Sequence, residues 1–142
     1  MFDWLANPNR FNRITKKLQP FILFIAVITL ISGLYFGLYD SPKDYQQGDA
    51  VRIMYVHVPS AWLATFLYFS LAISCVFYLV WKHPLADLVS SSIAPIGALF
   101  SALTLVTGSL WGKPMWGTWW VWDARLTSML VLFFFYLGYI LL

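Results

Sequence analysis

The stretch P-F-I-L-F-I-A-V-I-T-L-I-S-G-L-Y-F-G-L-Y, residues 20–39, holds twenty consecutive positions without a charged side chain. About 20 helical residues are needed to cross the roughly 30 Å hydrocarbon core of a bilayer. The run is too long for the apolar region of a signal peptide, and no A-x-A-like cleavage site follows it. We therefore expect a retained transmembrane helix.

Three further apolar runs of similar character follow, at residues 58–81, 93–110 and 126–142. Each is too long for a strand and does not alternate polar with apolar residues, so strands are not expected. The sequence thus predicts an all-α integral membrane helical bundle of about four transmembrane helices, with residues 1–142 as a single transmembrane domain. The fourth run is short and reaches the last residue, so we expect this domain to be partial, an N-terminal fragment.

Several residues are candidate helix boundaries. Pro59 and Pro95 stand near the starts of the second and third spans, where a proline costs little. The serines at 90–92 could cap the third helix, and Asp123 could cap the fourth. Pro114 follows the third span and is expected to help end it.

The composition excludes several classes of protein. Hydrophobic residues make up 61% of the chain and charged residues 11%, whereas soluble domains carry roughly 25% charged residues. A soluble enzyme and a disordered tail are therefore excluded, and Cys75 as a single cysteine excludes a disulfide scaffold. There is no C-x-x-C-H for covalent haem attachment and no P-loop for ATP. The net charge of +3 is concentrated near the N-terminus, which suits a membrane surface rather than nucleic acid.

The charges that flank the first span predict the orientation. Four basic residues at 10–17 face one acidic residue, Asp3, so the N-terminus should be cytoplasmic. The linker around Lys82 and His83 then lies inside as well, and segments 40–57 and 111–125 lie outside. Lys and Arg number five inside and four outside, so the orientation depends mainly on the first helix.

The outer segment W-G-K-P-M-W-G-T-W-W-V-W-D-A-R, residues 111–125, contains five of the eight tryptophans. One or two indoles at a helix end are typical of an interfacial aromatic belt. This density instead favours a surface that binds a large, planar, apolar molecule by ring stacking.

The backbone of this segment could be helical or extended. A helical backbone would place Trp116 and Trp120 on one face, and an extended backbone would add Trp122 to the same side. Two glycines and a proline favour an irregular backbone that lets a flat ligand approach closely: Gly112, Pro114 and Gly117.

His57, in R-I-M-Y-V-H-V-P, lies at the outer end of the second span, on the same side as the tryptophan segment. A lone histidine at a helix start is more often a cap or a surface residue. The tryptophan segment on the same side instead favours His57 as an axial ligand of haem iron, because a porphyrin is a planar apolar ligand of the kind that the indoles suit. Arg52 and Arg125 could pair with the haem propionates. Lys113 fits that role and a headgroup contact equally, and Asp123 fits a ligand contact and a helix cap equally.

Two parts of the sequence resemble a known family. W-G-T-W-W-V-W-D, residues 116–123, matches the W-G-x-x-W-x-W-D signature of the tryptophan-rich haem-handling proteins of cytochrome c biogenesis. The longer stretches G-S-L-W-G-K-P-M-W-G-T-W-W-V-W-D-A-R-L-T-S and D-Y-Q-Q-G-D-A-V-R-I-M-Y-V-H-V-P-S-A resemble the haem exporter protein C family of the bacterial cytochrome c maturation system.

The resemblance implies a fold of six transmembrane helices, with the tryptophan motif in an outer loop flanked by two histidine ligands of haem. His57 matches the first histidine, and this chain has no residue for the second. Two helices and one ligand are thus missing, which agrees with a fragment. The motif itself is matched by Trp116, Gly117, Trp120, Trp122 and Asp123. Trp119, Arg52 and Arg125 complete the expected site for a non-covalently bound haem b.

The resemblance also implies a location and partners. The family lies in the bacterial inner membrane, holds haem at the periplasmic face and presents it to a membrane-anchored haem chaperone. It associates with the ATPase and membrane subunits of an ABC transporter and with a small single-span protein. On this reading the chain is a haem-binding and haem-delivery protein, in contact with membrane lipid, and not an enzyme.

Two other functions compete with this one. A quinone- or haem-b-associated respiratory subunit would place histidines inside the spans, where this sequence has none. A purely structural anchor would use its tryptophans only to hold the interface.

Overall fold

The computed structural model describes residues 8–142, so Asp3 of the orientation argument lies outside the described residues. Within this part of the chain every long element is helical, which confirms the all-α prediction, and four helices are long and apolar enough to cross a membrane. A five-residue π-helix extends the first of them. The elements are α1 (Pro8–Tyr35), η1 (Phe36–Asp40), α2 (Val51–Trp81), α3 (Pro84–Trp116) and α4 (Ala124–Leu141).

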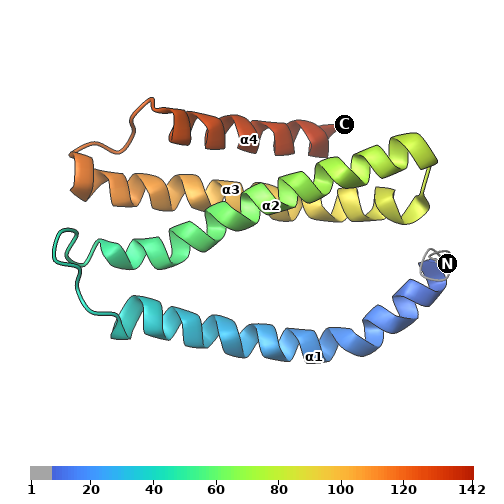
Figure 1. Ribbon diagram of the computed structural model, residues 1–142, viewed down its shortest axis with the longest axis horizontal. Helices are drawn as coiled ribbons and strands as arrows, with labels where there is room; N and C mark the ends of the chain where they lie inside the picture. The colour runs from blue at the N-terminus through green and yellow to red at the C-terminus, as the bar shows by residue number, and fades with distance from the viewer. Residues whose placement is uncertain (1–7) are drawn as a thin grey trace.

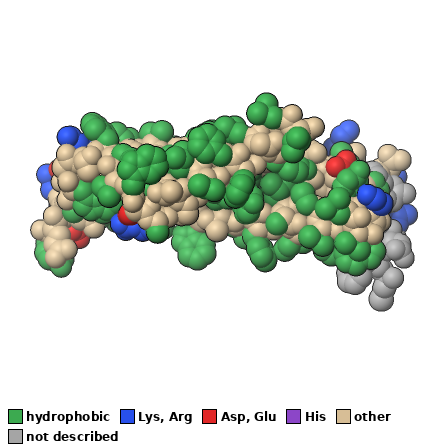
Figure 2. Space-filling model, turned by 90° about the horizontal axis from the view of Figure 1, so that it is seen from above, with side chains coloured by type: hydrophobic (Ala, Val, Ile, Leu, Met, Phe, Trp, Pro, Cys, Tyr) green, Lys and Arg blue, Asp and Glu red, His purple; other side chains and the backbone are tan. Residues whose placement is uncertain are grey.

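The helices lie lengthwise beside one another, with the connections at the two ends of the bundle (Figure 1). Segment 41–50 and the tryptophan-rich connection between α3 and α4 share one end. On the face seen in Figure 2, charged side chains gather toward the two ends and apolar side chains cover the middle. This distribution suits a bundle whose middle faces hydrocarbon. The first expected span runs from α1 into η1, and each of the other three falls in one helix, α4 ending one residue short. The positions of the membrane boundaries stay predictions.

Two helices begin earlier than their apolar runs. α2 starts at Val51, seven residues before the predicted span, so Pro59 lies inside the helix rather than at its start. α3 starts at Pro84, directly after His83 in its capping position. The prediction of a cap at residues 90–92 was therefore wrong: the Ser90 hydroxyl bonds back to the carbonyl of Asp87 within the helix. Proline suits the first turn because its missing N–H would be unpaired there.

The end of α3 also differs from the prediction. The helix continues through Gly112 and Pro114 to Trp116, so the irregular backbone starts only at Gly117. Gly117 has φ of +75° and donates its N–H to the carbonyl of Lys113 at 3.0 Å. A glycine at this position takes the left-handed conformation without strain, and it ends the helix in place of the proline. The predicted cap of the fourth helix is confirmed, since Asp123 accepts the N–H of Leu126.

α3 is the central helix of the bundle, in contact with both α2 and α4. Every buried residue of α3 is a glycine, alanine, serine or threonine, which lets neighbouring backbones come close. Gly97 receives the ring of Tyr136 from α4, in space that a Cβ would occupy. The Tyr136 hydroxyl then donates a hydrogen bond to the carbonyl of Ala64 on α2, at 2.7 Å. The buried residues of α3 are Ser90, Ala94, Gly97, Ala98, Ser101, Thr104, Thr107, Gly108 and Gly112.

α1 packs differently, because its apolar side chains are mostly exposed. In Figure 1 it lies apart from the other three helices along most of its length. Its connection to the bundle runs through η1, where Gly37 is buried against Tyr55 of α2. The bundle that positions the candidate site is therefore made by α2, α3 and α4.

Candidate functional site

A cavity of about 280 Å³ lies between α2, α3 and α4, near the end of the bundle that carries the tryptophan-rich connection. We call it the His57 cavity. It reaches the surface, because Trp116 and Arg125 in its lining are exposed. Its lining residues are Met54, His57, Ala61, Thr104, Leu105, Gly108, Trp111, Trp116, Arg125, Leu126 and Met129.

His57 enters the cavity from α2. Because α2 begins at Val51, His57 stands six residues inside the helix, about 9 Å along its axis, and not at the helix start as expected. Its Nδ1 lies 3.0 Å from the hydroxyl oxygen of Thr107 on α3. The ring passes over Gly108, where a Cβ would lie 3.1 Å from Cε1. Two neighbouring residues of α3 thus hold the imidazole in place, one by a polar contact and one by leaving room.

Trp111 and Trp116 form the α3 wall of the cavity. Their rings meet edge to face with centroids 5.1 Å apart, an arrangement that aromatic pairs favour. Trp111 is also held by loop 41–50, since its indole N–H donates to the side-chain oxygen of Gln47 at 2.9 Å. Gly112 is buried beneath Trp116, whose ring would lie 3.3 Å from an added Cβ. This glycine therefore serves the packing of a tryptophan within the protein.

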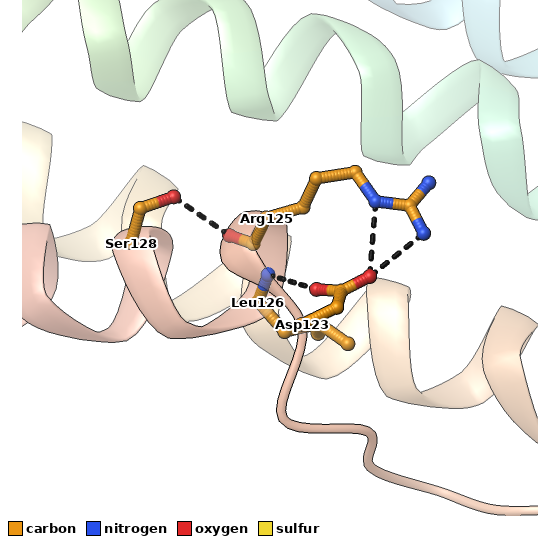
Figure 3. Close-up of polar contacts among 4 residues, drawn as sticks. All are labelled: Asp123, Arg125, Leu126 and Ser128. Atoms are coloured by element: carbon orange, nitrogen blue, oxygen red, sulfur yellow. Dashed lines mark hydrogen bonds and ion pairs between the residues drawn. The ribbon is translucent and has the colours of Figure 1, made fainter.

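Arg125 approaches the cavity from the first turn of α4. Its Nη2 and Nε lie 2.7 and 3.0 Å from one oxygen of the Asp123 carboxylate, whose other oxygen caps Leu126 (Figure 3). The guanidinium also lies 5.4 Å from the centre of the Trp116 ring. The Leu126 N–H, followed by the Arg125 side chain, lowers the pKa of the Asp123 carboxyl. The Asp123 carboxylate thus both caps α4 and holds a basic side chain at the cavity mouth.

The other predicted tryptophans lie outside the cavity lining. Trp119 and Trp122 are exposed, and Trp120 and Trp122 meet edge to face with centroids 5.4 Å apart. Lys113 lies over the Trp119 ring, 5.8 Å from its centroid. The indole nitrogen of Trp120 is buried and has no hydrogen-bond partner within the described part of the chain. We call these three indoles the tryptophan platform, residues 119, 120 and 122; Trp119 and Trp122 are exposed, Trp120 is half-buried, and none of the three lines the cavity.

Arg52 is not among the cavity lining residues. Its Nη2 donates to the carbonyl of Ser41 at 3.2 Å, and its Nε lies 3.8 Å from the Asp49 carboxylate. Asp49 in turn pairs with Lys43 at 2.7 Å, and this hydrogen bond lowers the pKa of the Asp49 carboxyl. In this structure the arginine holds loop 41–50 against the start of α2.

The structure therefore brings together three of the predicted site residues, His57, Trp116 and Arg125, one from each of three helices. Sequence reasoning missed the α3 residues beside the imidazole, Thr107 and Gly108, and the cavity wall residue Trp111. Their spacing carried a signal: positions 104, 107, 108 and 111 share one helical face. The polar contact between Thr107 and His57 joins two different helices, so spacing along one helix does not predict it.

The arrangement can hold a flat molecule that has a metal centre for the imidazole nitrogen to bind and carboxylates along one edge. The cavity is slightly smaller than the roughly 300–1,000 Å³ typical of small-molecule pockets. A porphyrin would thus be only partly enclosed, and its remainder would meet exposed groups such as the tryptophan platform. The guanidinium of Arg125, in the cavity lining, is a donor that suits propionates. The residues present fit such a group.

Comparison with known proteins finds a family match that covers the whole chain. The family model described as Heme exporter protein C matches residues 1–142. Heme exporter protein C of Bradyrhizobium diazoefficiens is 54% identical over 134 residues, which is 94% of this chain and 51% of that protein. The protein of the same name from Haemophilus influenzae is 53% identical over 141 residues, 97% of this chain and 57% of that protein.

The protein from Escherichia coli K12, which has the same name, is 49% identical over 138 residues, covering 97% of this chain and 56% of that protein. The chain thus spans about half the length of the curated relatives it matches.

Proposed function

The chain belongs to the heme exporter protein C family, and on this premise we propose that it holds haem b non-covalently for cytochrome c assembly. One observation carries the proposal: His57, Trp116 and Arg125, from three different helices, line a single cavity that reaches the surface. Imidazole is a common ligand of haem iron, and indole and guanidinium groups suit the ring and its carboxylates.

Haem is cargo in this role, so the protein's contribution is binding and orientation rather than turnover. His57 supplies the axial nitrogen, and Trp116 offers an indole surface next to it. Arg125 faces the propionates, with Asp123 fixing its position through two hydrogen bonds. Trp119, Trp120 and Trp122, together with the turn at Gly117, form the surface from which haem leaves.

The proposed setting is the bacterial inner membrane, with a cytoplasmic N-terminus and the His57 cavity at the periplasmic end. Haem held there is accessible to a periplasmic haem chaperone anchored in the membrane. The ATPase and membrane subunits of an ABC transporter and a small single-span protein are the proposed associates. Lys113 and Arg52, which lie at the same end of the bundle as the cavity, add positive charge on this side.

Replacement of His57 by alanine in the full-length protein tests the proposal. We expect the purified protein in detergent to lose most of its Soret absorbance per polypeptide, because the axial nitrogen is removed. His83→Ala is the matched control, since His83 lies at the opposite end of the bundle between α2 and α3. Equal haem content and an unchanged spectrum in both variants would refute His57 as the ligand.

A further inference from the structure

The hydroxyl of Thr107 stands between α3 and the imidazole of His57. Its oxygen lies 2.7 Å from the carbonyl oxygen of Leu103 and 3.3 Å from that of Thr104, both on its own helix. The same oxygen lies 3.0 Å from Nδ1 of His57. Thr107 is buried, with 8% of its surface exposed.

The hydroxyl carries a single O–H, so Thr107 has only one proton to donate among these three contacts. A carbonyl oxygen can only accept, so an oxygen–oxygen distance of 2.7 Å requires the Thr107 proton to point toward Leu103. The hydroxyl therefore turns a lone pair toward His57. Nδ1 must then carry a hydrogen and donate it, which leaves the unshared pair of the neutral ring on Nε2.

We propose that Thr107 is a positioning residue that holds His57 in the Nδ1–H tautomer and so presents Nε2 as the ligating nitrogen. The inference rests on the proposed haem-binding function and names the residue that prepares its ligand. Metal-binding histidines usually donate their other ring N–H to a fixed acceptor, which sets both tautomer and ring orientation. Here the acceptor is a neutral hydroxyl, which places no charge beside the apolar cavity, and the backbone carbonyl of Thr104 is a further neutral acceptor near the ring.

Gly108 completes the arrangement from the next position of α3. An added Cβ there would lie 3.1 Å from Cε1 and 3.6 Å from Nδ1 of His57. A side chain at this position would therefore push the ring away by a few tenths of an ångström. Thr107 and Gly108 together restrict both the rotation of the imidazole and the nitrogen that it exposes.

The tautomer can be measured without haem. In haem-free full-length protein labelled with ¹⁵N-histidine, the His57 signals are identified by comparison with His57→Ala. We expect a protonated Nδ1 and an unprotonated Nε2 in the unmodified protein and in Thr107→Ser, which keeps the hydroxyl. Thr107→Val keeps the shape but removes the acceptor, so we expect a mixture of tautomers or the Nε2–H form. An Nδ1–H signal that is unchanged in Thr107→Val would overturn the inference.

Haem titration then tests the consequence for binding. Thr107→Val should bind haem at least roughly 10-fold more weakly, as is typical when the outer partner of a metal-ligating histidine is lost. Thr107→Ser should restore binding close to that of the unmodified protein. Full haem affinity in Thr107→Val, with its tautomer altered, would also overturn the inference. A failure of the proposed function is seen separately, as a His57→Ala protein that keeps its Soret band.

Discussion

α3 and α1 are both long enough to cross a bilayer, yet they pack in opposite ways. In the most apolar 18-residue stretch of each helix, 39% of the residues are buried in α3 and 6% in α1. The less buried helix is the more apolar one, since the mean hydropathy of its stretch is 2.4 against 1.7 for α3. Hydrophobicity therefore does not decide which helix becomes the centre of this bundle.

The difference lies in the size of the side chains. Lipid is as apolar as leucine, so a large apolar residue gains little by leaving lipid for a protein neighbour. Small residues let helices approach closely and gain van der Waals contact. α3 carries such a row along one face, whereas α1 presents large residues such as Phe21, Phe24 and Leu30 to its surroundings. The same row of small residues makes room for His57 at Gly108.

Gly97→Ala should have the largest effect on stability. The added Cβ would overlap the ring of Tyr136, which must shift. Overpacking of this kind costs typically about 1–3 kcal/mol of unfolding free energy. Unfolding in mixed detergent, followed by circular dichroism, measures the loss.

The matched control is Gly33→Ala in α1, where an added Cβ would meet nothing within 4 Å. We expect no loss of stability there, because alanine has the higher helix propensity. Equal losses in the two variants would contradict the contrast between α3 and α1.

Tyr136→Phe should have a smaller effect. The substitution removes the hydrogen bond from the Tyr136 hydroxyl to the carbonyl of Ala64 and keeps the ring in place. Hydrogen bonds between transmembrane helices contribute on average about 0.6 kcal/mol, with a maximum of about 1.7 kcal/mol. The same unfolding assay applies. A loss larger than that of Gly97→Ala would show that a polar contact, rather than close packing, holds α4 on α3.

Asp123→Asn should have the smallest effect, and one that depends on pH. Asparagine keeps an oxygen for the Leu126 N–H but loses the charge toward Arg125. Because the pKa of Asp123 is lowered in the folded state, its charge contributes stability above the unfolded pKa of about 3.8. That contribution is lost as the pH falls through the lowered pKa.

Thermal unfolding of Asp123→Asn and the unmodified protein at pH 7 and pH 3 measures this contribution. We expect a gap in melting temperature at pH 7 that narrows at pH 3. A gap of equal size at both values would contradict an origin in the carboxylate charge.

Much of the fold could be predicted from charge distribution alone. Each apolar run is helical, the first continuing from α1 into η1, and only Leu142 lies after the end of α4. A long stretch without charges satisfies its backbone in lipid only as a helix. The start of α2 could not be predicted this way. Arg52 and His57 interrupt the apolar pattern, yet both lie within α2. Arg52 is accommodated there because it is paired with Ser41 and Asp49.

The site was predictable to a similar extent. Counting the spans puts His57 and the tryptophan segment at one end of the bundle, and the structure lines one cavity with His57 and Trp116. Which tryptophans would join them was not predictable. Trp111 and Trp116 lie on the cavity wall because α3 continues through Pro114, while Trp119, Trp120 and Trp122 follow the turn at Gly117 and lie outside the lining.

By itself the sequence determined the helical class, the four apolar runs long enough to cross a membrane and the two kinds of side chain, imidazole and indole, that line the candidate site. These depend on local composition and on spacing along one chain. Only the tertiary structure decided that Thr107 and Gly108 lie beside His57, because that contact joins positions about fifty residues apart across a helix interface. The close approach of α2 to α3, which small residues permit, holds the imidazole of His57 beside Thr107 and Gly108.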